Sequence, residues 1–220
     1  MSASGLIVAA PASGSGKTTL TLGILRALRR RGTSVGSFKV GPDYIDAAFL
    51  AAATGRPCYN VDSWGMRFDT LAGLIEESGR GCELLVGEGV MGLFDGAADG
   101  TGSTADVAAL FGFPVLLVVD AARMGASAAA LVDGFRRHRE DVVVAAVAFN
   151  RVGSPAHADL LRRACFEHLS TPIVGCIPRD EALTLPSRHL GLVQALEHPD
   201  LERLLDAAAD RAEAELDLDR

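Results

Sequence analysis

Short apolar runs alternate along the chain with longer segments in which apolar residues recur every three or four positions. The short runs predict strands at residues 6–10, 35–40, 84–88, 114–120, 142–150 and 172–177. The longer segments predict helices at residues 18–31, 47–54, 68–78, 104–111, 126–138 and 155–168. This regular alternation of strand and helix predicts an α/β fold, doubly wound, with a mainly parallel sheet.

The predicted strand at 114–120, PVLLVVD, is apolar without alternation, which is typical of a strand covered on both faces. Ligands of doubly wound folds bind beyond the carboxyl ends of the strands. The loops that follow the predicted strands are 11–17, 39–46, 88–102, 120–127, 150–154 and 178–190. We therefore expect the functional residues of this chain in these loops.

The last part of the chain, from Leu201 onward, is helix-forming and acidic and ends without a core pattern. It has two interpretations: a solvated terminal helix, or a linker toward a further domain. We accordingly predict one domain at residues 1–197 and an acidic helical tail at residues 198–220.

Composition narrows the classes of protein to which the chain can belong. The 220 residues are 49% hydrophobic, which predicts a single folded domain with a proper core. The formal net charge of −7 argues against a nucleic-acid partner, which would need a basic face. The N-terminus has no leader pattern, and no apolar run approaches the roughly 18–20 residues needed to span a bilayer. We expect a cytoplasmic protein without a membrane partner.

The cysteines and histidines show no spacing that is typical of a metal site, so we expect no structural metal. The scattered cysteines predict reduced thiols in an intracellular protein. They are Cys58, Cys82, Cys165 and Cys176.

The stretch APASGSGKTT at residues 10–19 lies between a predicted strand and a predicted helix. It is typical of a phosphate-binding loop, or P-loop. Backbone amides of such a loop surround phosphate oxygens, its lysine reaches the β- and γ-phosphates, and its threonine ligates Mg²⁺. Pro11 replaces the usual first glycine, at a position that shapes the turn and binds no phosphate directly. The predicted nucleotide-binding residues are Ser13, Gly14, Ser15, Gly16, Lys17, Thr18 and Thr19.

Four carboxylates lie in loops on the phosphate side of the predicted sheet: Asp43, Asp46, Glu88 and Asp95. Each of them alone is more typical of a helix cap or a solvent-facing acid. Together, beside a P-loop, they predict a site that holds Mg²⁺ and positions a nucleophile.

Several longer stretches resemble one enzyme family. They are FKVGPDYID at 38–46, TGRPCYNVDSW at 54–64, EGVMGLFDG at 88–96, NRVGSPAH at 150–157 and IPRDEALTLPSRHLGL at 177–192. Together they resemble the cobyrinic acid a,c-diamide synthases, which include the hydrogenobyrinic acid enzymes of aerobic cobalamin biosynthesis. The resemblance covers nearly the whole chain through Leu192. It implies a P-loop NTPase fold of the dethiobiotin synthetase type.

The resemblance also implies a reaction. ATP, with Mg²⁺, phosphorylates the c- and a-acetate carboxylates of a corrinoid acid, and ammonia displaces phosphate from each acyl phosphate to give the amide. In the family, ammonia comes from glutamine, which a C-terminal glutaminase domain hydrolyses with a Cys-His-Glu triad. This chain stops at Arg220, about where that domain should begin, and none of its cysteines has a nucleophile-elbow context. We expect this chain to use ammonia and a glutaminase domain to be its partner.

Matching motifs implies roles for individual residues. The predicted catalytic residues are Asp43, Asp46, Glu88, Asp95 and Lys39, and the predicted Mg²⁺ ligands are Thr18, Asp43 and Glu88. Lys39 is the candidate for a second cation near the γ-phosphate, where attack by a carboxylate needs charge compensation. The alternative for Lys39 is a surface lysine at a strand end.

The remaining candidates concern adenine and the ring. Asn150 occupies the position that reads the adenine amide edge in dethiobiotin synthetases, or else it caps a turn, and Pro178 with Arg179 would form the other adenine wall. His189 is either adjacent to the site or structural. Candidates for the corrinoid rim are Tyr44, Arg56, Trp64 and Arg123, although Trp64 is as compatible with core packing.

Other functions use the same P-loop. A dethiobiotin-synthetase-like carboxylate activator would leave the pair Asp43 and Asp46 unexplained. A non-catalytic nucleotide switch that binds a protein partner is disfavoured because Ala12 stands where the septum-placement and partition ATPases carry an extra lysine. Nickel-sirohydrochlorin a,c-diamide synthases share the motifs, so the metal content of the ring stays open. The oligomeric state stays open as well, with a homodimer among the alternatives.

Overall fold

A computed structural model describes residues 4–180, 187–188, 191–192 and 200–219. Its centre is a seven-stranded sheet whose paired strands all run parallel. The strands, in their order across the sheet, are β3 (Cys58–Val61), β2 (Val35–Val40), β4 (Leu84–Glu88), β1 (Ser4–Ala9), β5 (Val115–Asp120), β6 (Val144–Val152) and β7 (Ile173–Pro178). The predicted doubly wound α/β fold is confirmed.

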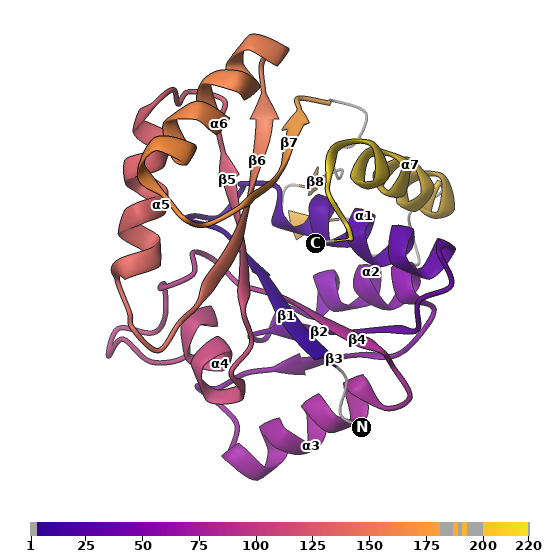
Figure 1. Cartoon of the computed structure of the whole chain (residues 1–220). Coiled ribbons are helices and arrows are strands. Elements are labelled where there is room, and N and C mark those ends of the chain that lie inside the picture. Colours follow the sequence, from indigo (N-terminus) through magenta and orange to yellow (C-terminus); the bar gives the residue numbers. More distant parts are fainter. Residues whose placement is uncertain (1–3, 181–186, 189–190, 193–199, 220) are drawn as a thin grey trace.

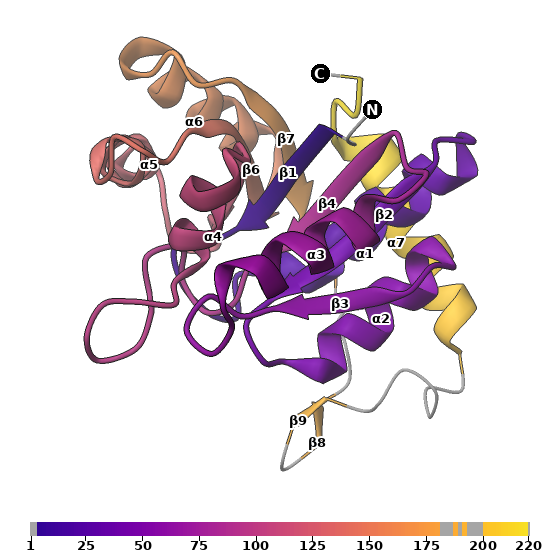
Figure 2. The same cartoon turned by 90° about the horizontal axis from the view of Figure 1, so that it is seen from below.

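Helices cover both faces of the sheet, as Figure 1 shows. One face carries α1 (Lys17–Arg30), α2 (Tyr44–Thr54) and α7 (Leu201–Glu215). The other face carries α3 (Phe68–Gly79), α4 (Thr104–Phe111), α5 (Ser127–Arg137) and α6 (Pro155–His168). A short antiparallel pair, β8 (Ser187–Arg188) and β9 (Gly191–Leu192), lies apart from the main sheet (Figure 2).

Successive residues of the central strand β1 face opposite sides of the sheet and build two separate cores. Ile7 and Ala9 pack with the core under α3–α6, whereas Val8 packs with the core under α1, α2 and α7. All three side chains are at most 1% exposed. This double coverage explains why the strands read as continuous apolar runs.

The elements differ from the sequence expectations in several places. The short edge strand β3 was not predicted, because its four residues are mostly only half-buried and carry little apolar signal. Helix α2 begins at Tyr44, three residues before the predicted start, because Asp43 caps it. Strand β6 ends at Val152, two residues beyond the predicted end. Among the described residues, no helix combines the length and the apolar character that a membrane crossing requires.

The interpretation of the C-terminal segment as a solvated tail is wrong for α7, which belongs to the core of the domain. It packs along α1 with four buried residues, Leu205, Ala208, Ala209 and Ala212. After the helix, Leu216 forms a β-bridge with Gly175 of β7. The boundary predicted between residues 197 and 198 therefore does not separate two packing units. The buried face of α7 was not predicted, because its alanines contribute little to the hydrophobic periodicity of the sequence.

Candidate active site

The P-loop leaves the carboxyl end of β1 and leads into α1. Gly14 and Gly16 have φ of 76° and 90°, the left-handed region in which glycine carries no steric cost. A side chain at Gly16 would also collide with the amide of Asn150. The two glycines therefore allow the loop to curl tightly at the start of α1, where backbone amides and the helix dipole favour an anion.

Lys17, the first residue of α1, reaches back across this loop. Its Nζ donates to the carbonyl oxygen of Met91 at 2.6 Å and to that of Ala12 at 3.4 Å. Burial lowers the pKa of Lys17, and the charge of Glu88 offsets this only in part. The ammonium is thus held beside the loop, where it can contact a phosphate.

Four side chains from four elements meet next to the P-loop. Lys39 of β2 donates to Asp46 Oδ2 at 2.7 Å and to Glu88 Oε1 at 3.0 Å. Thr18 donates to the same Glu88 oxygen at 2.6 Å and lies 3.5 Å from Asp46 Oδ2. Lys39 is 2% exposed, so the alternative of a surface lysine is wrong.

The sheet register brings this cluster together. Glu88 ends β4 and pairs with Val8 of β1 on one side and with Lys39 of β2 on the other. Parallel strands end at the same edge of the sheet, so a carboxylate and an ammonium that are 49 residues apart come into contact. Helix α2 then supplies Asp46 from its first turn.

Burial and charge oppose each other in the cluster. Burial raises the pKa of Glu88, and Lys39 lowers it by a smaller amount. Burial alone would lower the pKa of Lys39, but the carboxylates of Glu88 and Asp46 outweigh it and raise that pKa. A second cation in the cluster would further favour the charged form of Glu88.

The donor set fits such a cation. Within the described part of the chain, Asp46 Oδ1 and Glu88 Oε2 are buried without a hydrogen-bond partner. These oxygens and the Thr18 hydroxyl are the hard ligands that Mg²⁺ takes, usually with water and phosphate oxygens completing its shell. The described residues contain no group of three or more His, Cys, Asp or Glu side chains that could hold a metal ion without such help.

The other two predicted acids are placed differently. Asp43 lines the cavity, but its Oδ1 accepts from the backbone amides of Ile45 and Asp46 and caps α2. Of the two aspartates, Asp46 and not Asp43 lies next to Thr18 beside Glu88, and Asp46 was not among the predicted metal ligands. Asp95 is exposed and accepts from the amide of Gly92, which shapes the loop that carries Met91. The chemical roles of Asp43 and Asp95 stay predictions.

The candidates for the ring rim do not all lie at this edge of the sheet. Tyr44 and Trp64 are each 66% exposed and follow the carboxyl ends of β2 and β3, so core packing of Trp64 is excluded. Arg123 lines the cavity after β5. Arg56 precedes β3 at the opposite edge and donates to the carbonyl oxygen of Arg80. Its assignment to the site is wrong, because residues before a parallel strand lie at the amino ends.

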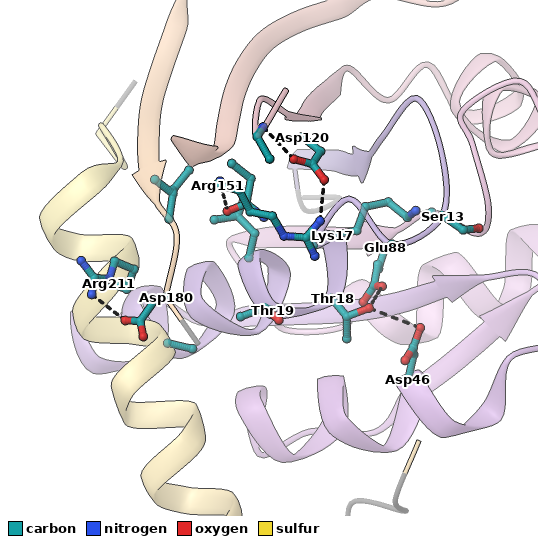
Figure 3. A pocket seen from close by; sticks show the side chains of 18 of the residues that line it. Ser13, Lys17, Thr18, Thr19, Asp46, Glu88, Asp120, Arg151, Asp180 and Arg211 are labelled. Atoms are coloured by element: carbon teal, nitrogen blue, oxygen red, sulfur yellow. Dashed lines mark hydrogen bonds and ion pairs between the residues drawn. The ribbon is translucent and has the colours of Figure 1, made fainter. Parts of the chain in front are cut away.

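A cavity of about 850 Å³ runs from the P-loop across the ends of β5, β6 and β7 to α7 (Figure 3). Asn150, Pro178 and Arg179 line it, as do all the predicted P-loop residues except Ser15. The amide of Asn150 donates to the carbonyl oxygen of Ser15 at 2.9 Å, so it supports the P-loop in this structure. The predicted hydrogen bonding of the Asn150 amide to adenine stays a prediction. His189 lies outside the described residues.

Sequence reasoning missed two ion pairs on the cavity wall. Asp120 at the end of β5 pairs with Arg151, and Asp180 after β7 pairs with Arg211 of α7 (Figure 3). Arg151 has a left-handed φ of 56°, which is uncommon for a residue with a side chain. Asp120 could have been found, because it ends the apolar run PVLLVVD. Arg211 gave no signal, since it lies in the segment interpreted as a tail.

Comparisons with known proteins agree with this geometry. Residues 6–193 match the family described as CobQ/CobB/MinD/ParA nucleotide binding domain. Curated relatives include the hydrogenobyrinate a,c-diamide synthases of Brucella anthropi, 56% identical over 98% of this chain and 49% of that protein, and of Rhizobium meliloti, 54% identical over 98% and 50%. The corresponding synthase of Agrobacterium fabrum is 49% identical over 100% and 50%. The chain spans about half the length of the curated relatives it matches.

Solved structures share the fold at low identity. Chloroplast FtsY from Physcomitrella patens aligns with a TM-score of 0.56 and 15% identity, over 94% of this chain and 66% of that one. The signal recognition particle receptor FtsY from Elizabethkingia anophelis, in complex with GDP, aligns with a TM-score of 0.58 and 14% identity, over 94% and 64%. These likenesses concern the fold alone.

Proposed function

Because the chain belongs to the family of CobQ/CobB/MinD/ParA nucleotide binding domains, we propose that it is an ATP-dependent amidoligase of cobalamin biosynthesis. Its substrate is cobyrinic or hydrogenobyrinic acid, and its products carry amides at the a- and c-acetates. The observation that carries the proposal is the cluster of Lys39, Asp46, Glu88 and Thr18 beside Lys17, in a chain more than half identical to a named diamide synthase.

The first step is phosphoryl transfer to a carboxylate. A ring acetate oxygen attacks the γ-phosphorus of ATP, the bond to the bridging oxygen breaks, and ADP leaves. Both reactants are anions, so their repulsion must be cancelled. Lys17 would bind the β- and γ-phosphates, and the P-loop amides would hold the phosphate chain in place. Mg²⁺ supplies further charge neutralisation and would be held by Thr18, Asp46 and Glu88.

The second step converts the acyl phosphate into the amide. Ammonia attacks the acyl carbon, the carbon–oxygen bond to phosphate breaks, and the nitrogen loses a proton. The described carboxylates would serve this step by retaining the phosphate through the cation. The exposed Tyr44 and Trp64 with Arg123 would bind the large flat ring with its many carboxylates at the open side of the site.

The inference on the nitrogen source rests first on sequence context, because none of the four cysteines lies in a nucleophile-elbow context, and the thiols agree with it. Burial raises the pKa of Cys58 to about 12 and that of Cys165 to about 11, so neither is a thiolate near neutral pH. A glutaminase of the Cys-His-Glu type needs such a nucleophile. We therefore infer that these 220 residues use free ammonia, and that a glutaminase domain is the physiological partner that supplies it.

The test is mass spectrometry of hydrogenobyrinic acid after incubation with the purified chain, ATP, Mg²⁺ and either ammonium or glutamine. We expect conversion of carboxyl to amide with ammonium, at a rate that rises with pH as more ammonia becomes available, and none with glutamine. Parallel reactions with the cobalt-containing ring identify the preferred substrate. Amidation with glutamine alone would contradict the inferred nitrogen source. If no corrinoid acid stimulates ATP hydrolysis and none is converted to an amide, the proposed amidoligase activity is contradicted.

A further inference from the structure

Helix α7 is fixed tightly to α1, the helix that begins in the P-loop. A Cβ added to Gly23 of α1 would lie 2.5 Å from the carbonyl oxygen of Ala208, so the two backbones nearly touch. Ion pairs along the same interface join Arg26 to Asp206 and Arg30 to Asp210. The bridge between Leu216 and Gly175 then anchors the chain that follows α7 to β7. Helix α7 is thus held in one position relative to the cavity.

This packing places part of α7 in the cavity wall. Ala208, Arg211 and Ala212 line it, together with Asp180 after β7. Arg211 Nη2 contacts Asp180 Oδ2 at 2.6 Å, and Arg211 Nη1 lies 3.5 Å from Glu215 Oε1. Two carboxylates therefore orient one guanidinium at this end of the cavity. Figure 3 shows the pair on the far side of Thr19 from Glu88 and Asp46.

The position of the phosphates decides what this end can bind. Lys17 and the P-loop would hold the phosphate chain at the start of α1, with the carboxylate cluster on one side of it. The part of the cavity beyond the ends of β6 and β7 is left for the ribose and the base. Alanines in the wall leave space there, and an oriented guanidinium offers a flat face and fixed N–H donors.

We propose that α7 forms a wall of the nucleoside half of the cavity, and that Arg211 contacts the base or ribose while Asp180 positions it. This inference rests on the proposed function, in which the ligand is ATP. It assigns nucleotide recognition to a helix beyond the 6–193 segment that matches the family. Arg211 sets the affinity for the nucleoside and leaves the affinity for the phosphates unchanged.

The test compares two ligands that share phosphates and differ in the nucleoside. Binding of ATP and of inorganic tripolyphosphate, each with Mg²⁺, is measured by calorimetry for the parent chain and for Arg211→Ala. We expect Arg211→Ala to weaken ATP binding by about tenfold or more, since it removes charged contacts, and to change tripolyphosphate binding by less than about twofold. Asp180→Asn should weaken ATP binding by a smaller factor, because it removes only the positioning contact.

Arg203→Ala is the matched control, because Arg203 lies on the same helix with its side chain 88% exposed. We expect it to bind both ligands like the parent chain. If Arg211→Ala loses affinity for ATP and for tripolyphosphate equally, or loses affinity for neither, the inference is overturned while the proposed function stays intact. If Arg211→Ala does not fold, Arg211→Lys keeps the charge and should still lose affinity for ATP alone. Failure of the parent to bind either ligand would overturn the nucleotide site itself.

Discussion

The hydroxyl of Thr18, the second residue of α1, donates a 2.6 Å hydrogen bond to Glu88, the last residue of β4. This contact joins the P-loop to a carboxylate that is completely buried and that also accepts from Lys39. The hydroxyl that should ligate Mg²⁺ and the acid that should share this cation are therefore already side by side. Under the proposed function the cluster would be a prearranged site for charge neutralisation, in which little reorganisation is needed at the moment of reaction.

Substituting Glu88→Gln removes the buried charge and keeps the shape of the side chain. We expect turnover to fall by about 100-fold or more, with a much smaller change in ATP affinity, because the charge matters most when the acyl phosphate forms. Steady-state kinetics and equilibrium binding of ATP measure the two effects. Glu76→Gln, on the exposed face of α3, should behave like the parent. A Glu88→Gln enzyme with full turnover at saturating ATP would refute the role of this carboxylate.

Two substitutions at Asp43 separate its cap from its charge. Asn caps a helix as well as Asp does, so Asp43→Asn should keep the stability of α2 and lose only the charge. We expect turnover to fall in Asp43→Asn with an unchanged midpoint of denaturant unfolding. Asp43→Ala should additionally lose about 1 kcal/mol of stability. If Asp43→Asn keeps full turnover, Asp43 is a helix cap and nothing more.

The Lys39→Met variant is expected to need a higher pH than the parent to bind Mg²⁺. Lys39 lowers the pKa of Glu88, which burial already raises, so its removal raises that pKa further. Mg²⁺ binds the deprotonated acid, and its affinity in the variant should therefore recover only at higher pH. Removing one partner of the buried pair should also cost about 3–5 kcal/mol of stability.

Titrations of Mg²⁺ and ATP across a pH series measure the pH midpoint, at which the Mg²⁺ affinity is half recovered. Urea unfolding measures the stability. Lys39→Arg keeps the positive charge, and its midpoint should stay near that of the parent. A midpoint in Lys39→Met that does not move, or that moves to lower pH, would show that Lys39 does not control the ionisation of Glu88.

Two helical glycines test the close packing of α7 on α1. Gly23→Ala forces a Cβ toward the carbonyl oxygen of Ala208, and we expect a loss of about 1–3 kcal/mol, typical of overpacking. Gly73 of α3 has nothing within 4 Å of an added Cβ, so Gly73→Ala should gain about 0.5–1 kcal/mol from helix propensity. Denaturant unfolding of both variants measures these changes. We expect the free energy of unfolding to fall in Gly23→Ala and to rise in Gly73→Ala. A stabilised Gly23→Ala would contradict the close packing of α7 on α1.

The alternation of helices with the six longer strands, the mainly parallel sheet and the P-loop were determined by the sequence alone, because each rests on local signals. A buried parallel strand reads as a continuous apolar run, and the spacing of glycines, Lys17 and Thr18 is read along one loop. The carboxyl-end rule then predicted the edge of the sheet that holds Glu88, Asp46 and Lys39. The family resemblance rested on the same loops.

Tertiary structure alone decided which of these residues touch. The register of β2 against β4 pairs Lys39 with Glu88, and the cap at Asp43 turns α2 so that Asp46 faces Thr18. Arg56 lies before β3, at the amino ends of the parallel strands, and the acidic C-terminal segment packs against α1 as α7, whose Arg211 lines the cavity. These contacts join residues far apart in the sequence, so no local pattern encodes them, and only the packing of helices on a twisted sheet brings them together.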